Sequence, residues 1–145
     1  MIYWDSSLIV KLYIREEQSP AVVQTVKSID LAIPFTHLHD LEINNALNLK
    51  LFCGEVEKSE VDYLRKKIQT HEEVGVYYRP SLDWTDIFRA ANDFSNRHTS
   101  RIDVRSLDIL HVAIAISIGA ESFMTNDIRQ RLLATAVGLK IETLR

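Results

Sequence analysis

Two aspartates follow short apolar stretches of the chain, and each precedes a predicted helix. Asp5 comes directly after Ile2–Trp4, and Asp127 follows Ser122–Thr125. The carboxyl ends of parallel strands meet at one edge of a sheet, and neighbouring strands lie about 5 Å apart. We therefore expect the two carboxylates to lie close enough to share a cation. Taken alone, each aspartate is better explained as the N-cap of the helix that follows it.

A glutamate falls within an apolar stripe of the helix predicted over Thr36–Cys53. Helical spacing groups Glu42 with the following apolar residues: Leu38, Leu41, Ala46, Leu49, Phe52 and Cys53. A carboxylate facing a core is costly unless it is paired, hydrogen-bonded or bound to a metal. The pattern favours a metal-binding or catalytic role for Glu42, and a buried ion pair with an arginine is the alternative.

A fourth acid lies in the first turn of a very apolar helix predicted from Ser106 to Ile118. Asp108 shares a helical stripe with Val112 and Ala115, and a helix that is apolar nearly all round is expected to be buried. The positive end of the helix dipole favours a carboxylate there, so dipole compensation is the alternative explanation.

Together these acids predict a site for a hard divalent cation. Hydrolysis of a phosphodiester needs an activated water, an in-line approach and neutralisation of charge, and Mg²⁺ or Mn²⁺ supplies all three. Such cations take oxygen ligands and keep several waters. The sequence contains no Gly-rich phosphate loop, no His pair at metal spacing and no G-x-S-x-G motif. A metal-dependent nuclease is therefore the favoured function. The predicted catalytic and metal-binding residues are Asp5, Glu42, Asp108 and Asp127.

Weaker candidates lie beside these acids. Three polar residues are expected to orient ligands or water, and the last two are equally explained as a strand end and a turn: Ser7, Thr125 and Asn126. Three arginines are expected to hold backbone phosphates, with a solvated loop as the alternative: Arg97, Arg101 and Arg105.

Short apolar strands alternate with helices along the chain, which predicts an α/β fold with a mainly parallel sheet. The expected strands are Ile2–Trp4, Leu31–Ile33, Val76–Tyr78, Ser122–Thr125 and Leu139–Thr143. The helix over Thr36–Cys53 carries a second apolar stripe, made of Ile43, Leu47 and Leu51. We expect that stripe to meet either the helix that follows Ser59 or a second copy of the chain.

Composition places few limits on function. The 145 residues fit a single domain over residues 1–145. The formal net charge of −3 does not by itself indicate nucleic-acid binding. Cys53 is the only cysteine, which excludes an internal disulfide and a cysteine-built zinc site. With no signal peptide or membrane-spanning stretch in the sequence, we expect a cytoplasmic protein without a membrane role.

Four short motifs make the chain resemble PIN domains. They are Ile2-Tyr3-Trp4-Asp5-Ser6-Ser7, His39-Asp40-Leu41-Glu42, Arg105-Ser106-Leu107-Asp108 and Phe123-Met124-Thr125-Asn126-Asp127. Their order is most similar to that of the compact VapC-like toxins of toxin–antitoxin pairs. The resemblance implies a three-layer α/β/α sandwich, a Mg²⁺- or Mn²⁺-dependent endoribonuclease that cuts RNA, a homodimer and a cognate antitoxin.

Other functions stay open at this point. The same fold is also compatible with a non-catalytic module that binds nucleic acid or protein, in which the acids are caps and ion pairs. A nuclease that acts on DNA remains an alternative, because no residue obviously reads a 2′-hydroxyl. An aspartyl phosphatase is disfavoured, because Ser7 occupies the place where a second aspartate is needed.

Overall fold

The computed structural model describes residues 1–144, which divide into two compact units. The first unit combines Met1–Asp5 with Pro80–Thr143, and the second comprises Ser6–Arg79 with Leu144. Each unit is described by itself. The predicted α/β class with parallel strands is confirmed, because all paired strands in both units run parallel.

The first unit holds three strands and most of the helices of the C-terminal half. Its elements are β1 (Ile2–Trp4), α5 (Trp84–Phe94), the π-helical turn η2 (Ser95–Thr99), α6 (Ser100–Ile102), α7 (Ser106–Ser117), β4 (Ser122–Met124), α8 (Ile128–Ala136) and β5 (Lys140–Glu142).

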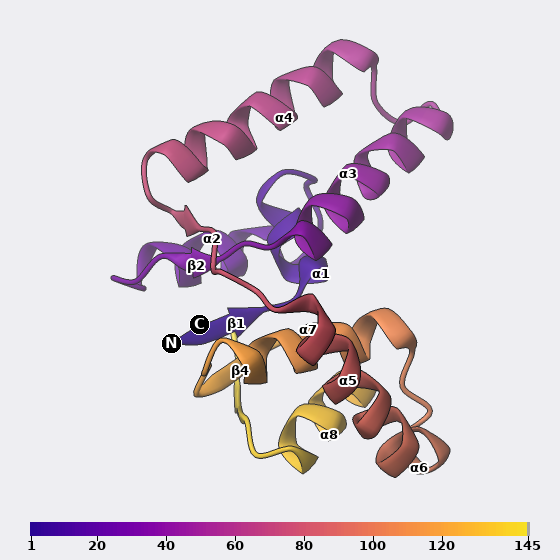
Figure 1. The fold of residues 1–145 in the computed structure, drawn as a ribbon. Helices are drawn as coiled ribbons and strands as arrows, with labels where there is room; N and C mark the ends of the chain where they lie inside the picture. The colour runs from indigo at the N-terminus through magenta and orange to yellow at the C-terminus, as the bar shows by residue number, and fades with distance from the viewer. Residues whose placement is uncertain (145) are drawn as a thin grey trace. The chain divides into compact units, whose positions relative to one another are not determined.

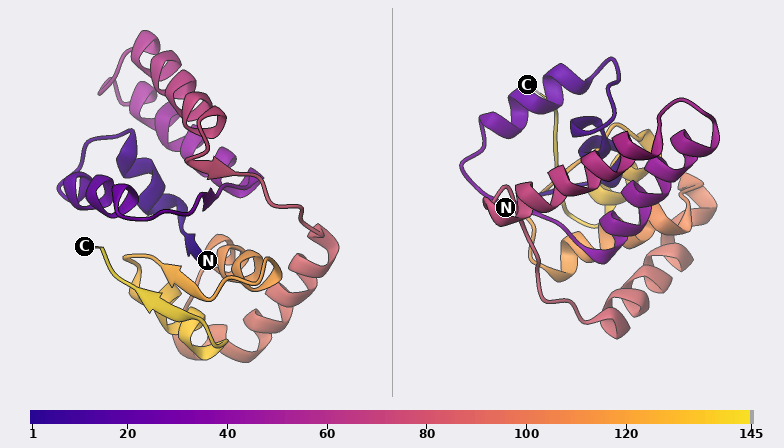
Figure 2. Two further views of the ribbon diagram at one scale, coloured as in Figure 1. Left: turned by 90° about the vertical axis from the view of Figure 1, so that its left-hand side faces the viewer. Right: turned by 90° about the horizontal axis from the view of Figure 1, so that it is seen from above.

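The sheet of the first unit has the strand order β1-β4-β5. In Figure 2, β4 and β5 run side by side in the orange and yellow part of the chain. The register places Trp4 opposite Met124, so both strands end at the same edge of the sheet. The backbone amide of Asp5 extends this ladder by donating to the carbonyl of Met124 at 3.1 Å. The predicted neighbourhood of the strands that precede Asp5 and Asp127 is thus confirmed.

The core of the first unit forms around α7. Its residues from Ile109 to Ala115 are all buried, as the apolar sequence predicts. Helix α5 packs along α7 through its buried Ile87 and Phe94. On β1, the Tyr3 ring stacks on Phe123, and its hydroxyl lies 2.8 Å from Nδ1 of His111. A polar group on the buried helix thus has a partner on the neighbouring strand.

The second unit is built mainly from helices. Its elements are α1 (Ser6–Ile9), the 3₁₀ turn η1 (Val10–Leu12), α2 (Ser19–Lys27), β2 (Ile33–Pro34), α3 (His37–Phe52), α4 (Lys58–Glu73) and β3 (Tyr77–Tyr78). Strands β2 and β3 pair in parallel, with Ile33 opposite Tyr77. Pro34, which follows the predicted strand Leu31–Ile33, is part of β2.

Helices α3 and α4 form an antiparallel hairpin, which Figure 1 shows as two long neighbouring arms. The face of α3 that is buried carries Ile43 and Leu47, and the fully buried Val61 lies on α4. The second of the two predicted apolar stripes is therefore the one that packs. A groove of about 590 Å³ lies between the two helices.

The stripe that sequence spacing assigned to the core is largely exposed, and that prediction is wrong. Leu41 is 62% exposed, Leu49 54% and Phe52 88%, and Cys53 is exposed as well. Glu42 is half-buried rather than central to a buried stripe. The reason is that α3 is apolar on two sides, and its partners within the unit cover only one of them.

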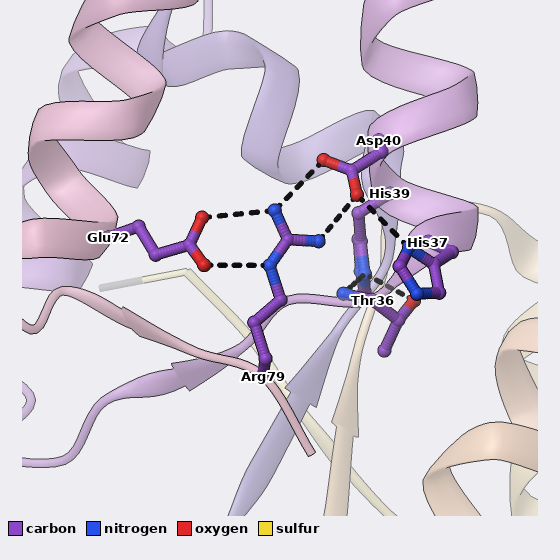
Figure 3. A network of polar contacts seen from close by, with 6 residues as sticks. All are labelled: Thr36, His37, His39, Asp40, Glu72 and Arg79. Carbon is purple, nitrogen blue, oxygen red and sulfur yellow. Dashed lines mark hydrogen bonds and ion pairs between the residues drawn. The ribbon is translucent and has the colours of Figure 1, made fainter. Parts of the chain in front are cut away.

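Arg79 joins the two arms of the hairpin at their open end, as Figure 3 shows. Its Nε and Nη2 donate to the carboxylate of Glu72 at 2.9 and 3.0 Å, and Nη2 also donates to Asp40 at 3.1 Å. The guanidinium lies 5.0 Å from the centroid of the Phe35 ring. Hydrogen bonding to Arg79 lowers the pKa of Glu72. This fork geometry holds the base of α3 against the end of α4.

A second polar cluster ties η1 to the same hairpin. The Tyr13 hydroxyl lies 2.8 Å from Nδ1 of His71 and 2.7 Å from the hydroxyl of Tyr77. Burial raises the pKa of both phenols. Burial, followed by the nearby charge of Lys67, lowers the pKa of His71. The neutral imidazole is therefore the form that this cluster favours.

None of the helices in the described part of the chain is both long and apolar enough to cross a membrane.

The pattern of exposure on α3 predicts that two leucines two residues apart contribute very differently to the free energy of unfolding. Leu47→Ala should lower the free energy of unfolding by about 2–5 kcal/mol, because it removes a buried side chain. Leu49→Ala should change it by less than about 0.5 kcal/mol, because that side chain is already solvated. Denaturant unfolding of both variants measures the difference. A larger loss for Leu49→Ala would restore the stripe predicted from the sequence.

The lowered pKa of His71 predicts a pH-dependent contribution to stability. The unfolded chain takes up a proton near the ordinary value of 6.5, whereas the folded protein resists it. The contribution is thus present above pH 6.5 and is lost as the pH falls through the folded pKa. The stability advantage of the wild type over His71→Gln should therefore shrink between about pH 7 and pH 5. Unfolding free energies measured across this range test the effect, and an advantage that grows on acidification would contradict it.

Candidate functional site

Asp5 is a buried carboxylate at the end of β1. Only 4% of the residue is exposed, and its Oδ2 accepts a hydrogen bond of 2.7 Å from the hydroxyl of Thr125. Burial of a charged carboxylate is unfavourable unless hydrogen bonds or a cation compensate it. The position of Asp5 follows from the β1–β4 register, since the residue after Trp4 meets the residue after Met124.

Thr125 connects Asp5 with the second aspartate of this edge. Its hydroxyl donates to Asp5 and accepts from the backbone amide of Asp127 at 3.0 Å. The hydroxyl thus donates its one proton to the carboxylate of Asp5, and one of its lone pairs accepts from the backbone amide of Asp127. The structure therefore gives Thr125, predicted as a supporting residue, contacts to both acids.

Asp127 is exposed and begins α8. Its Oδ1 accepts from the amide of Gln130 at 2.9 Å, which makes it the N-cap of the helix. The N-cap explanation considered for this residue is therefore correct for that oxygen. A cap at the carboxyl end of a strand still presents a carboxylate at the sheet edge, beside Thr125.

Asp108 is half-buried in the first turn of α7. Its backbone carbonyl lies 3.4 Å from Nε2 of Gln130, a fully buried side chain on α8. Gln130 therefore joins the first turns of the two helices that carry Asp108 and Asp127. Gln130 could not be predicted from the sequence, because a glutamine in a helix has no distinctive spacing.

Three further predicted residues are placed as follows. Glu42 on α3 and the exposed Ser7 on α1 belong to the second unit. Asn126 is half-buried in the turn between β4 and α8. The candidate site is therefore built from the three aspartates of the first unit, with Thr125 and Gln130 as their contacts. The roles of Glu42, Ser7 and Asn126 stay predictions.

The three predicted phosphate-binding arginines are all exposed and precede Asp108 in the chain. Arg97 forms an ion pair with Asp93 and lies 5.6 Å from the Phe94 ring centroid. Arg101 lies in α6, and Arg105 is the N-cap position of α7. Between these two, Asp103 adopts a left-handed backbone with φ of 56° and pairs with Arg129 at 3.3 Å.

Arg131 is a further site residue that sequence reasoning missed. Its Nε donates to the carbonyl of Thr125 at 2.9 Å, so its side chain reaches back to the end of β4. The available signal was its position four residues after Asp127, because residues at that spacing share a helix face.

The oxygen donors of this edge suit a hard cation. Among residues 1–144, no group of three or more His, Cys, Asp or Glu side chains lies close enough to hold a metal ion. Mg²⁺ does not require such a cage, because it commonly binds one or two carboxylates, substrate phosphates and several waters. The donor set of Asp5 and Asp127, with Asp108 on the neighbouring helix, is of the chemical kind that this coordination uses.

No family model matches the chain, and no curated protein matches it either. Solved structures are similar in fold. The FitAcB structure from Neisseria gonorrhoeae is 14% identical, with 97% of this chain and 96% of that chain covered and a TM-score of 0.69. The VapBC2 structure from Rickettsia felis, bound to a DNA fragment from their promoter, is 12% identical over 100% of both chains, with a TM-score of 0.70.

These comparisons correct the family assignment suggested by the sequence motifs. Identities of 12–14% establish a shared fold alone, and no family model supports membership of the PIN domains. The identification of the chain as a VapC-like toxin therefore does not stand. The motifs are short and separated in the sequence. The acids they contain are therefore evidence for a functional site only through their positions in the structure.

Proposed function

We propose that this protein is a metal-dependent nuclease that hydrolyses phosphodiester bonds in RNA. The observation that carries the proposal is the hydroxyl of Thr125, which contacts the buried carboxylate of Asp5 and the backbone of Asp127 at the ends of adjacent parallel strands. A buried carboxylate held in this way is suited to binding a cation. Mg²⁺ is the proposed cofactor, and Mn²⁺ is its expected substitute.

Each acid has a distinct role in this proposal. Asp5 and Asp127 hold the cation from the strand ends, and Asp108 adds a carboxylate from the start of α7. Glu42, which lies in the second unit, keeps its predicted role as the fourth acid. The cation, when bound, supplies a water of lowered pKa and neutralises charge on the phosphate. The hydrogen bond from Thr125 fixes the orientation of the Asp5 carboxylate at the end of β1.

RNA is the proposed substrate, with its backbone held by Arg97, Arg101 and Arg105. These exposed cations precede Asp108 and offset the negative charge of the acids. A single-stranded segment is the proposed form of the substrate, because its backbone can bend to reach the carboxylates.

We also propose a protein partner, a homodimer and a cytoplasmic location. The similar folds occur in toxin–antitoxin complexes, which supports a protein partner in general terms. The exposed apolar residues of α3 offer a surface for a second copy of the chain. A lone cysteine suits a reducing compartment. The parallel strands and flanking helices support an overall three-layer α/β/α arrangement.

Purified protein should cleave mixed cellular RNA with Mg²⁺ or Mn²⁺ and not with EDTA. Asp5→Asn and Asp108→Asn should each lower the cleavage rate by about 100-fold or more, because a neutral amide is a poorer ligand for a hard cation. Asp86→Asn is the matched control, since Asp86 is an exposed acid of the same unit that pairs with Arg89. Gel analysis of cleavage over time measures the rates, and thermal unfolding checks that each variant is folded.

The opposite outcomes are informative. Full activity of folded Asp108→Asn would remove that residue from the site. Failure of the wild type to cut RNA with either metal would turn the proposal first to a DNA substrate, and then to a binding module.

Replacement of Thr125 should weaken the cation site without removing any carboxylate. Thr125→Val lacks the hydroxyl that contacts Asp5, whereas Thr125→Ser keeps it. Thr125→Val should require about 10- to 100-fold more Mg²⁺ for half-maximal cleavage, and Thr125→Ser should stay close to the wild type. Mg²⁺ titration of the cleavage rate measures this difference. Equal requirements in both variants would show that the hydroxyl does not orient a ligand.

A further inference from the structure

Arg131 lies in the first turn of α8, four residues after Asp127. Its backbone amide donates to the carbonyl of Asp127 at 3.0 Å, which places it on the first turn of hydrogen bonds. Its half-buried side chain turns back toward the sheet, where Nε donates to the Thr125 carbonyl. The guanidinium is therefore anchored at the end of β4.

The same residue that anchors Arg131 also holds Asp5. The Thr125 carbonyl accepts from Arg131, and the Thr125 hydroxyl donates to Asp5 and accepts from Asp127. One threonine thus connects a guanidinium with two acids of the proposed site. The three hydrogen bonds are each 2.7–3.0 Å long, so the guanidinium of Arg131 is held at the same edge as the carboxylates.

Two other arginines of the first unit form ion pairs with carboxylates. Arg97 pairs with Asp93, and Arg129 pairs with Asp103. Within residues 1–144, the contact of Arg131 is to a neutral carbonyl, with no carboxylate at ion-pair distance. A guanidinium carries five N–H donors, and Nε uses one of them. Its two terminal nitrogens keep the geometry that matches phosphate oxygens.

We propose that Arg131 binds a phosphate oxygen of the RNA next to the bond that is cut. This inference rests on the proposed nuclease function and adds a substrate-binding residue to it. An arginine anchored through Nε loses little further conformational freedom when a phosphate arrives. It also offsets the repulsion between the substrate and the acids that hold the cation.

A purely structural role makes a different prediction. If Arg131 only caps the Thr125 carbonyl that follows β4, its loss lowers stability but leaves the number of phosphate contacts unchanged. The salt dependence of RNA binding separates the two roles. Each phosphate contact to a single strand adds about 0.7 to the slope of log affinity against log salt concentration.

The test compares Arg131→Gln with Arg129→Gln, a neighbouring exposed arginine on the same helix. The probe is a fluorescently labelled single-stranded RNA, cleaved in Mg²⁺ at salt concentrations between about 50 and 200 mM. Arg131→Gln should lower kcat/KM about 10- to 100-fold and reduce its salt slope by about 0.7. Arg129→Gln should stay within about twofold, because an exposed ion pair contributes little.

Arg131→Lys and Arg131→Met complete the set. Lysine keeps the charge but not the fork, so its salt slope should match the wild type while kcat/KM falls. Methionine keeps much of the apolar stem of the arginine side chain. Arg131→Met replaces Arg131→Gln as the test variant if thermal denaturation shows that Arg131→Gln does not fold.

The outcomes separate the two proposals. A wild type that cleaves, with folded Arg131→Gln or Arg131→Met matching Arg129→Gln in kcat/KM and slope, would overturn the role of Arg131 and leave the nuclease intact. A wild type that neither binds nor cleaves RNA in Mg²⁺ would overturn both.

Discussion

The hydrogen bond between Thr125 and Asp5 depends on the parallel pairing of the first strand with the fourth, and the rest of the candidate site depends on it in turn. A carboxylate that is almost fully buried needs a donor, and the observed register supplies one in the hydroxyl of Thr125. A shift of the pairing by one residue would turn alternate side chains to the other face of the sheet. The register of the short strands is therefore fixed, and the ends of the strands determine where the aspartates that follow them lie.

Local features of the fold were predictable because their causes are local. Gly54 and Gly119 follow α3 and α7 with φ of 70° and 69°, a region that favours glycine, and both helix ends were predicted to within one residue. The N-cap role of Asp127 was also predictable, since an aspartate before a helix is a good N-cap. Pairing of the strands preceding Asp5 and Asp127 followed from their apolar composition and order.

Long-range features were not predictable for a physical reason. Helix α3 has two apolar stripes, and the sequence alone cannot tell which one its partners will cover; Leu47 is buried and Leu49 is solvated. The contacts of Arg131 and Gln130 depend on where α8 lies against β4 and α7. The family assignment was wrong because short, separated motifs can contain the residue types of a site in proteins that do not belong to the same family. Fold similarity at low identity does not supply that relationship either.

The first unit is discontinuous, which has a consequence for the order in which the chain assembles during translation. All the helices and strands of the second unit lie within residues 6–79, so they are synthesised before the C-terminal half of the chain. The first strand, in contrast, is made at once and then waits for a partner whose hydrogen bonds lie 120 residues further along the chain. Such distant pairing is slow because a long loop must close first. The aspartate edge of the nascent chain therefore forms after the helices of the second unit have been synthesised.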